Sequence, residues 1–300
     1  MSKKYSRNMV GYGAEELIIQ WPNNARIAVQ IVLNYEEGAE NCVLNGDKHS
    51  EVFLSEIIGA QPIKGRHINM ESLYEYGSRS GFWRLHKLFQ EKKIPVTIFG
   101  VGMALEKNPE VCKAIKKAGY EVASHGWRWI DYQNISKSEE KKHMKLAIKT
   151  IKKIFGTRPL GWYTGRCSPN TRDLVFEEGG FLYDSDSYND DLPYWETRNK
   201  KKQLIIPYTL DNNDMRFATN QGFNTGEHFF TYLKDSFDAL YEEGKNNPKM
   251  MSVGLHCRLI GRPGRIQSLR KFLDYVLKHE DVWICKRIDI ANHWIKNYST

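Results

Sequence analysis

The strongest constraint on the fold of this 300-residue chain is a regular alternation of apolar, strand-like runs with amphipathic helical segments. Strands that alternate with helices build parallel β-α units. The expected strands span residues 27–33, 95–101, 120–124, 160–163, 181–184, 204–208, 250–255 and 282–285. About seven or eight such units in one chain favour an α/β barrel over an open sheet.

Helical segments are expected between these strands. Pro109 stands at the first position of an expected helix over residues 109–118. Ser136 and Glu139 form a capping-box pattern for a helix that ends near Phe155. The other expected helices span residues 81–92, 171–178, 227–243, 266–279 and 289–297.

Two long polar segments fall outside the alternation. Residues 1–25 are expected to form an N-terminal arm that takes part in oligomer contacts, and residues 26–300 a single barrel domain. Residues 38–70 are also polar and punctuated by Gly and Pro. Segments of this length in a compact domain usually serve function or oligomer contacts.

Composition and charge argue against several classes of protein. The formal net charge of +8 comes from lysines on expected helix surfaces, and no basic stripe with interleaved aromatic residues indicates nucleic-acid binding. The five cysteines are scattered, without a Cys-x-x-Cys pair, which argues against a disulfide framework and a thiolate metal site. No apolar h-region follows the first residues and no stretch approaches a membrane span, so we expect a cytoplasmic protein without a membrane partner.

Polar side chains gather where the expected strands end. In a β/α barrel these positions share one face, where ligands bind. Taken singly, several of these residues have a purely structural explanation. His125 can be a core histidine, Asp211–Asp214 a turn, and Arg166 a surface charge. Their joint occurrence indicates chemistry. The clusters are Glu36-Glu37, Gly100 and Gly102, Ser124–Trp127, Tyr163–Arg166, Asp184–Ser187, Asp211–Asp214 and His256–Arg258.

The order of these clusters resembles that of the NodB-like polysaccharide deacetylase superfamily. The resemblance implies a distorted (β/α)7 TIM-like barrel, and in most members a divalent metal held by one aspartate of a Thr-Phe-Asp-Asp motif and two histidines of a His-x3-His motif. This chain departs from that pattern, because Glu36-Glu37 replaces the aspartate pair and Trp129 stands four residues after His125. The family's three-ligand catalytic metal site cannot be assembled from these positions.

The departures resemble one branch of the superfamily, the metal-independent allantoinases of urate catabolism. The similarity extends from about Arg7 to Trp294, and its motifs are long. They include Asn34–Gly38, Met70–Gly77, Gly161–Arg166, Tyr183–Tyr188, Asp190–Trp195 and Gly254–Arg258. The resemblance implies hydrolysis of a cyclic amide, allantoin to allantoate, by a cytoplasmic homotetramer that needs no metal cofactor.

The resemblance also implies roles for individual residues. Glu36 occupies the catalytic-base position and His256 the general-acid position. Glu37 would hold His125 or bind a ring N–H, and Arg166 would stabilise the oxyanion or the product carboxylate. The expected substrate-binding residues are Tyr163, Asp184, Asp186 and Asn212 as polar contacts, and Trp127, Trp129 and Trp195 as rings that pack on the flat ureide.

Two other functions remain open at this point. One is a metal-dependent N-deacetylase of chitin or peptidoglycan, which shares the fold but needs the second histidine. The other is a non-catalytic barrel that binds ureides or sugars. An adventitious divalent metal bound by Glu37 and His125 is compatible with the sequence in either case.

Overall fold

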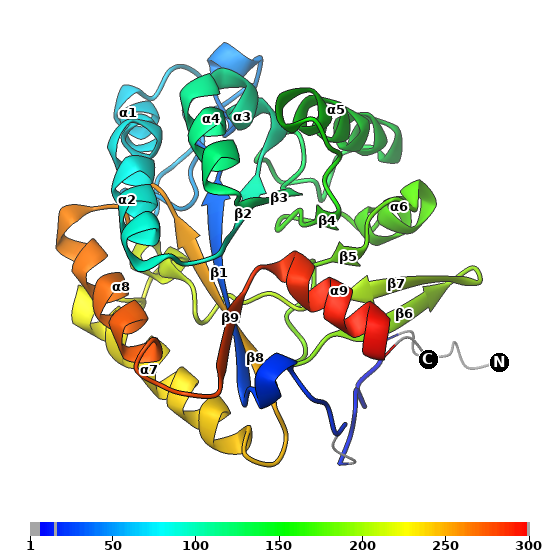
Figure 1. Ribbon diagram of the computed structural model, residues 1–300. Helices are drawn as coiled ribbons and strands as arrows, with labels where there is room; N and C mark the ends of the chain where they lie inside the picture. The colour runs from blue at the N-terminus through cyan, green and yellow to red at the C-terminus, as the bar shows by residue number, and fades with distance from the viewer. Residues whose placement is uncertain (1–6, 15–16, 299–300) are drawn as a thin grey trace.

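The computed structural model describes residues 7–14 and 17–298, and within these ranges nine strands form one curled sheet (Figure 1). The order along the sheet is β6-β7-β5-β4-β3-β2-β1-β8, with β9 also paired to β1. All pairings are parallel except β6 with β7. The strands are β1 (Ile27–Tyr35), β2 (Val96–Gly100), β3 (Glu121–Ser124), β4 (Gly161–Trp162), β5 (Tyr183–Asp184), β6 (Tyr194–Arg198), β7 (Lys201–Ile205), β8 (Lys249–His256) and β9 (Val282–Cys285).

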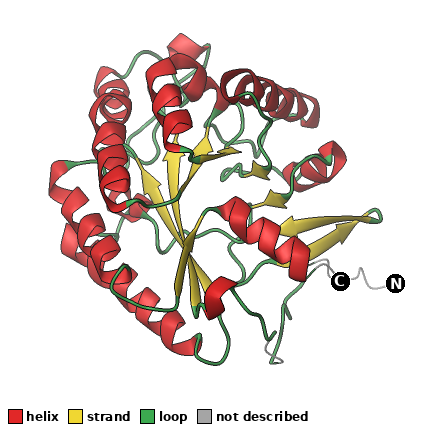
Figure 2. Cartoon of the chain, in the orientation of Figure 1, coloured by secondary structure: helices red, strands yellow, loops and turns green. Residues whose placement is uncertain are grey.

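Helices cover the outside of the sheet, which lies in the centre of the molecule (Figure 2). The expected distorted α/β barrel is therefore confirmed, as an open, curled half-barrel. The helices are α1 (Ile68–Tyr76), α2 (Phe82–Lys92), α3 (Gly102–Lys107), α4 (Pro109–Ala118), α5 (Lys137–Phe155), α6 (Thr171–Glu178), α7 (Gly226–Glu243), α8 (Pro263–Val276) and α9 (Arg287–Asn297).

Strand β1 is the central element, and all nine of its residues are buried. One edge of β1 pairs with β8 from Ile27 to Asn34. The other edge is shared, because β9 pairs with Ile27–Gln30 and β2 with Ile31–Tyr35. A strand enclosed on both edges and both faces reads as a continuous apolar run, which is why the sequence predicted it well.

Among the described strands and α-helices, the sequence missed one strand and two helices. Strand β6 forms an antiparallel hairpin with β7, and its half-buried residues leave no apolar run in the sequence. Helix α1 begins at the end of the polar segment of residues 38–70 and buries only Met70 and Tyr74. Helix α3 has six residues, too few to show a period. Helix α5 begins as expected, with Ser136 Oγ accepting from the backbone N–H of Glu139 at 3.3 Å.

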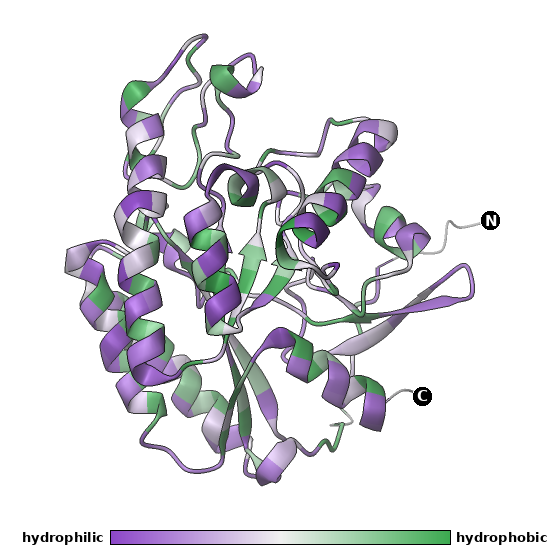
Figure 3. Ribbon diagram, turned by 45° about the horizontal axis from the view of Figure 1, so that its top comes forward, coloured by the Kyte–Doolittle hydropathy of each residue, from purple (hydrophilic) through white to green (hydrophobic). Residues whose placement is uncertain are grey.

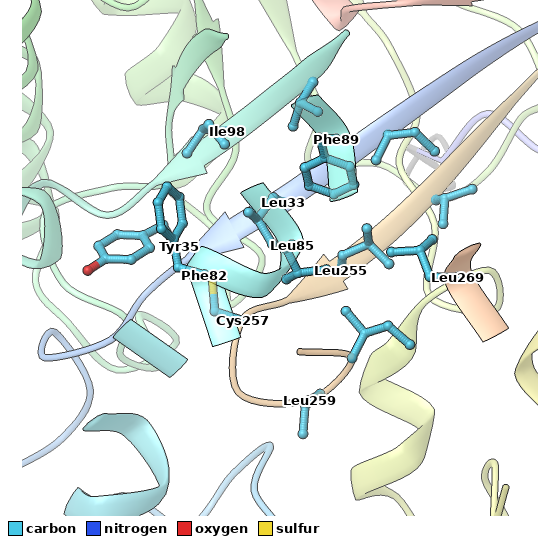
Figure 4. Close-up of a cluster of buried hydrophobic side chains, with 14 of the residues drawn as sticks. Leu33, Tyr35, Phe82, Leu85, Phe89, Ile98, Leu255, Cys257, Leu259 and Leu269 are labelled. Carbon is cyan, nitrogen blue, oxygen red and sulfur yellow. The ribbon is translucent and has the colours of Figure 1, made fainter. Parts of the chain in front are cut away.

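The main hydrophobic core lies between the sheet and its outer helices. Leu33 of β1, Leu255 of β8 and Phe82, Leu85 and Phe89 of α2 belong to this cluster (Figure 4). The outer surfaces of the helices are largely hydrophilic, as Figure 3 shows by hydropathy. This burial holds β1 and β8 in register, so that their carboxyl ends reach the same face.

Inside the barrel, the first residue of α9 is a fully buried arginine. Arg287 donates hydrogen bonds to Gln30 Oε1 and Ser252 Oγ, both at 2.8 Å, to Ser185 Oγ at 3.0 Å and to the Pro207 carbonyl at 3.0 Å. Because β9 pairs only with the first half of β1, the chain enters α9 at mid-barrel. Polar side chains from several strands thus fill the interior below the strand ends.

The expected arm of residues 1–25 lies partly outside the described residues, which omit 1–6 and 15–16. Its last part packs on the barrel, since Trp21 is buried and its Nε1 donates to the Lys249 carbonyl at 2.9 Å. Its role in oligomer contacts stays a prediction. Among the described helices, none has the length and apolar character needed to cross a membrane.

Candidate active site

Glu36 follows the last residue of β1 and is 1% exposed. A tight turn comes next, in which the Ala39 N–H donates to the Glu36 carbonyl at 3.0 Å. Gly38 makes this turn possible with a φ of 96°, a backbone conformation that residues with a Cβ rarely adopt. The strand end and the turn therefore fix the Glu36 carboxylate at the carboxyl end of the sheet.

Three side chains from the ends of other strands meet this carboxylate. His125, directly after β3, places Nε2 3.2 Å from Glu36 Oε1. His256, the last residue of β8, places Nε2 3.4 Å from the same oxygen. Arg258 places Nη2 2.7 Å from Oε2. Burial alone would raise the pKa of Glu36, but Arg258 and the two histidines outweigh it, so that the pKa lies well below its ordinary value.

His256 is held from its other side by Asp214, the first residue of a short helical turn, Asp214–Ala218. Nδ1 of His256 lies 2.6 Å from Asp214 Oδ1. Asp214 Oδ2 accepts the backbone N–H groups of His256 at 2.8 Å and Ile260 at 3.0 Å. Burial lowers the pKa of His256, but the Glu36 and Asp214 carboxylates raise it to about 9. The imidazole is therefore protonated at neutral pH.

Glu37, the next residue, is also buried and makes different contacts. Its Oε2 accepts the Glu36 N–H at 3.0 Å, and Arg258 Nη1 lies 3.5 Å from its Oε1. Burial raises the pKa of Glu37, an effect that Arg258 partly offsets. The carboxylate packs on Gly77, where a Cβ would lie 2.3 Å from Oε1. The expected contact with His125 is made by Glu36 instead.

Arg258 and Asp214 stood in the strand-end clusters of the sequence, but neither was given a role in the site. The Arg258 side chain is 1% exposed and lies 4.2 Å from the ring centre of Tyr74 and 5.0 Å from that of Trp129. Nε donates to the Leu54 carbonyl at 2.8 Å. The signal in the sequence was its position two residues after His256, at the end of β8.

Arg166 lies farther out than expected. Nη1 of Arg166 is 3.5 Å from Glu51 Oε2, and the guanidinium lies 5.1 Å from the centre of the Trp129 ring. Trp129 itself is buried and stacks on Phe53 at 6.0 Å. The Trp129 ring thus lies near both Arg166 and Arg258. The segment of residues 38–70 contributes Glu51, Phe53 and Leu54 to the same wall.

Two of the expected substrate contacts lie near the histidines. The Tyr163 ring lies 4.8 Å from the His125 ring, and its hydroxyl lies 2.9 Å from that of Tyr188. Asn212 is 7% exposed, and its carbonyl accepts the Gly254 N–H at 2.9 Å. Within the described residues, Asn212 Oδ1 has no hydrogen-bond partner.

The other expected contacts support the structure around the site. Asp184 accepts from Arg172 at 2.8 Å, and Asp186 accepts the backbone N–H groups of Thr164 and Gly165. Two tryptophans lie elsewhere. Trp127 packs against Gly102, where a Cβ would lie 2.8 Å from the ring, and Trp195 Nε1 donates to the Tyr298 carbonyl at 2.6 Å.

A cavity of about 230 Å³ lies beside Glu37. Its lining includes Tyr35 of β1, Tyr74 of α1 and Lys107 at the end of α3. The cavity therefore approaches the site from the side of the outer helices, with the Glu37 carboxylate at its boundary.

Comparison with known proteins identifies the family. Residues 69–174 match the family model described as polysaccharide deacetylase. A Schizosaccharomyces pombe protein with a provisional polysaccharide deacetylase name is 45% identical over 294 residues, covering 91% of this chain and 92% of that protein. The chain belongs to the polysaccharide deacetylase family.

Two solved structures of similar proteins extend this result to the whole fold. A protein of Pseudomonas aeruginosa PAO1, provisionally named a polysaccharide deacetylase, is 57% identical with a TM-score of 0.97, covering 99% of this chain and 100% of that one. A Puue allantoinase is 56% identical with a TM-score of 0.98 and the same coverage. The NodB-like deacetylase fold is thereby confirmed.

The residues at the polysaccharide deacetylase metal positions do not fit a divalent ion. They are Glu37, His125 and Trp129, and tryptophan offers no ligand atom. The Arg258 guanidinium contacts both glutamates and would repel a second cation. In the described part of the chain, no three His, Cys, Asp or Glu side chains are grouped to hold a metal ion. Function without a cofactor stays a prediction.

Proposed function

We propose that this polysaccharide deacetylase family member hydrolyses a cyclic amide, converting allantoin to allantoate. One observation carries the proposal: Glu36 Oε1 and His256 Nε2 lie 3.4 Å apart. The lowered pKa of Glu36 favours its ionised form, and the pKa of His256, raised to about 9, favours the protonated imidazole at neutral pH. This pair provides a base and an acid in one buried place. The 56% identity to a Puue allantoinase over 99% of the chain supports the substrate.

The reaction begins with the base. The Glu36 carboxylate takes a proton from a water molecule, whose oxygen bonds to the amide carbon of the ring. The electron pair of the C=O bond moves to its oxygen, which becomes negative. His256 Nε2 then gives its proton to the ring nitrogen as the C–N bond breaks, and the ring opens to a carboxylic acid and a free ureido N–H.

The short distance between Glu36 and His256 also allows both groups to return to their starting protonation states. After ring opening Glu36 carries a proton and His256 has lost one, and their facing atoms lie 3.4 Å apart. Transfer of the proton from Glu36 to His256 restores both groups. The proton of the new carboxylic acid leaves with solvent.

Asp214 and His125 position these groups. The 2.6 Å contact of Asp214 with Nδ1 leaves Nε2 of His256 facing Glu36. Because an ionised carboxylate only accepts, His125 donates from Nε2 to Glu36, and its Nδ1 has no partner within the described residues. Nδ1 of His125 and Oδ1 of Asn212 are therefore free to bind the polar edge of a ureide.

A second candidate is hydrolysis of N-acetyl groups on a polysaccharide. The provisional names of two relatives, at 45% and 57% identity, favour it. Both reactions cleave an amide C–N bond, so the same base and acid serve either. A cytoplasmic location and a homotetramer go with the allantoinase proposal, and both stay predictions.

Turnover distinguishes the two functions. The purified protein is given allantoin or an acetylated chito-oligosaccharide, each before and after dialysis against a chelator. We expect allantoate formation that survives chelation, and no acetate release. Acetate release that depends on added zinc, without allantoin turnover, would establish the deacetylase instead.

A further inference from the structure

We propose that the Arg258 guanidinium is the resident cation of this site, standing among the positions that hold a divalent metal elsewhere in the family. The inference deepens the proposed function, since it assigns the positive charge that faces the reacting oxygen. Its central test measures metal binding, and therefore does not depend on allantoin being the substrate.

The position of Arg258 carries the first part of the argument. Nη2 lies 2.7 Å from Glu36 Oε2 and Nη1 3.5 Å from Glu37 Oε1, so one guanidinium bridges the two neighbouring carboxylates. Trp129, at the lost histidine position, lies 5.0 Å from the same guanidinium. Arg258 therefore contacts the base and two of the three residues at the metal positions.

The surroundings of Arg258 form a site built for a planar cation. The Tyr74 ring lies 4.2 Å away, the Trp129 ring 5.0 Å away, and the Leu54 carbonyl accepts from Nε at 2.8 Å. Aromatic faces attract a buried cation through their quadrupole. Trp129 therefore does more than replace a metal-binding histidine, because its ring also packs against the Arg258 guanidinium.

One buried donor of this cation lacks a well-formed hydrogen bond within the described residues. Nη2 of Arg258 and Oε2 of Glu36 are close enough for an ion pair, yet within the described residues neither makes a hydrogen bond of good geometry. When Glu36 takes the proton from water, the negative charge on Oε2 disappears and a negative charge forms on the substrate oxygen. Arg258 then donates a hydrogen bond to the substrate oxygen, and its positive charge stabilises the negative charge that has formed there.

Metal uptake tests the proposal. We would dialyse wild-type protein, Arg258→Met and Arg258→Lys against Co²⁺, and then measure bound metal by mass spectrometry and by cobalt absorption. Arg258→Met removes the charge and leaves Glu36, Glu37 and both histidines in place. We expect Arg258→Met to bind Co²⁺ at least about tenfold more tightly than wild type, because the repulsion between the guanidinium and the metal ion is gone. Arg258→Lys keeps a positive charge and should gain nothing.

Arg262→Met is the matched control. Arg262 also stacks on a tyrosine, with its guanidinium 3.6 Å from the Tyr76 ring centre, and its nearest acid is Glu56 at 3.9 Å. This variant should bind no more Co²⁺ than wild type. Circular dichroism and thermal melting verify that each variant is folded.

A second pair of variants covers the case in which Arg258→Met does not fold. Trp129→His restores the ligand type but keeps Arg258, and should not take up Co²⁺ tightly. Trp129→His combined with Arg258→Ala should bind about one ion per chain. Tight Co²⁺ binding by wild type or by Trp129→His alone, or no gain in a folded variant that lacks Arg258, would overturn the proposal.

Discussion

Nδ1 of His256 lies 2.6 Å from Oδ1 of Asp214, while its Nε2 faces Glu36 at 3.4 Å. The imidazole thus lies between two carboxylates, one directly after β1 and one in the helical turn Asp214–Ala218. In the proposed reaction, Asp214 orients the ring and Glu36 takes part in proton transfer. This division predicts different consequences for the loss of each acid.

Replacement of Glu36 by Gln should remove the base and leave the shape of the site in place. We expect kcat for allantoin to fall by about 10²- to 10⁴-fold, the range typical for a positioned acid or base. Stopped assays give kcat, and calorimetry gives substrate affinity, which should change little. Glu121→Gln is the control, since this carboxylate contacts Thr97 and Tyr183 outside the site. Normal turnover by Glu36→Gln would show that the base is elsewhere.

The pH dependence of the wild-type enzyme should reflect both groups. Activity needs His256 protonated, and its pKa is raised to about 9. Activity needs Glu36 ionised, and its pKa lies well below the ordinary value. We therefore expect kcat/KM to be flat through neutral pH and to fall above about 9. A fall through pH 6 to 7 on the alkaline side would contradict a protonated His256.

Asp214→Asn should move the alkaline limb of this profile. The Asp214 carboxylate favours the charged imidazolium, so its loss lowers the pKa of His256 and activity falls at lower pH than in wild type. At acidic pH the variant should recover part of its activity. A variant profile that is lower at every pH by one constant factor would indicate a merely structural role for Asp214.

Gly77→Ala tests the packing of Glu37. The added Cβ would lie 2.3 Å from Glu37 Oε1, although the φ of −55° at Gly77 suits alanine. We expect the side chain of Glu37 to shift, with a loss of about 1–3 kcal/mol in unfolding free energy. Chemical denaturation measures the loss. Gly65→Ala, where a Cβ has nothing within 4 Å, should leave stability unchanged.

The sequence predicted the fold where segments were long and regular. Strand β1 and helix α5 appear close to their expected bounds, because one is a continuous apolar run and the other starts at a clear cap. Strand β6 could not be expected, since its side chains depend on a hairpin partner rather than on their own pattern. Pairing of this kind is settled by tertiary structure.

Part of the site was predictable because its residues follow strands that the sequence predicted. Glu36, His125 and His256 follow expected strands, and their meeting follows from parallel strands sharing one edge. Arg258 is one of 44 lysine and arginine residues, and apart from its position two residues after His256 nothing local marks it as buried beside two aromatic rings. Asp214 looked like part of a turn, because its partner His256 lies 42 residues away.

The hydrogen bonds of Arg287 have a consequence for how the sheet is held together. The sheet ends at β8 on one side and at the β6–β7 hairpin on the other, and one isolated bridge, Asn213 with Gly254, joins the chain after β7 to β8. Arg287 donates both to Gln30 and Ser252, from β1 and β8, and to Ser185 and Pro207, which follow β5 and β7. The Arg287 side chain thus links the two edges of the open sheet by hydrogen bonds inside the barrel. The strand ends that carry Glu36 and His256 therefore keep their spacing without backbone hydrogen bonds that close the sheet.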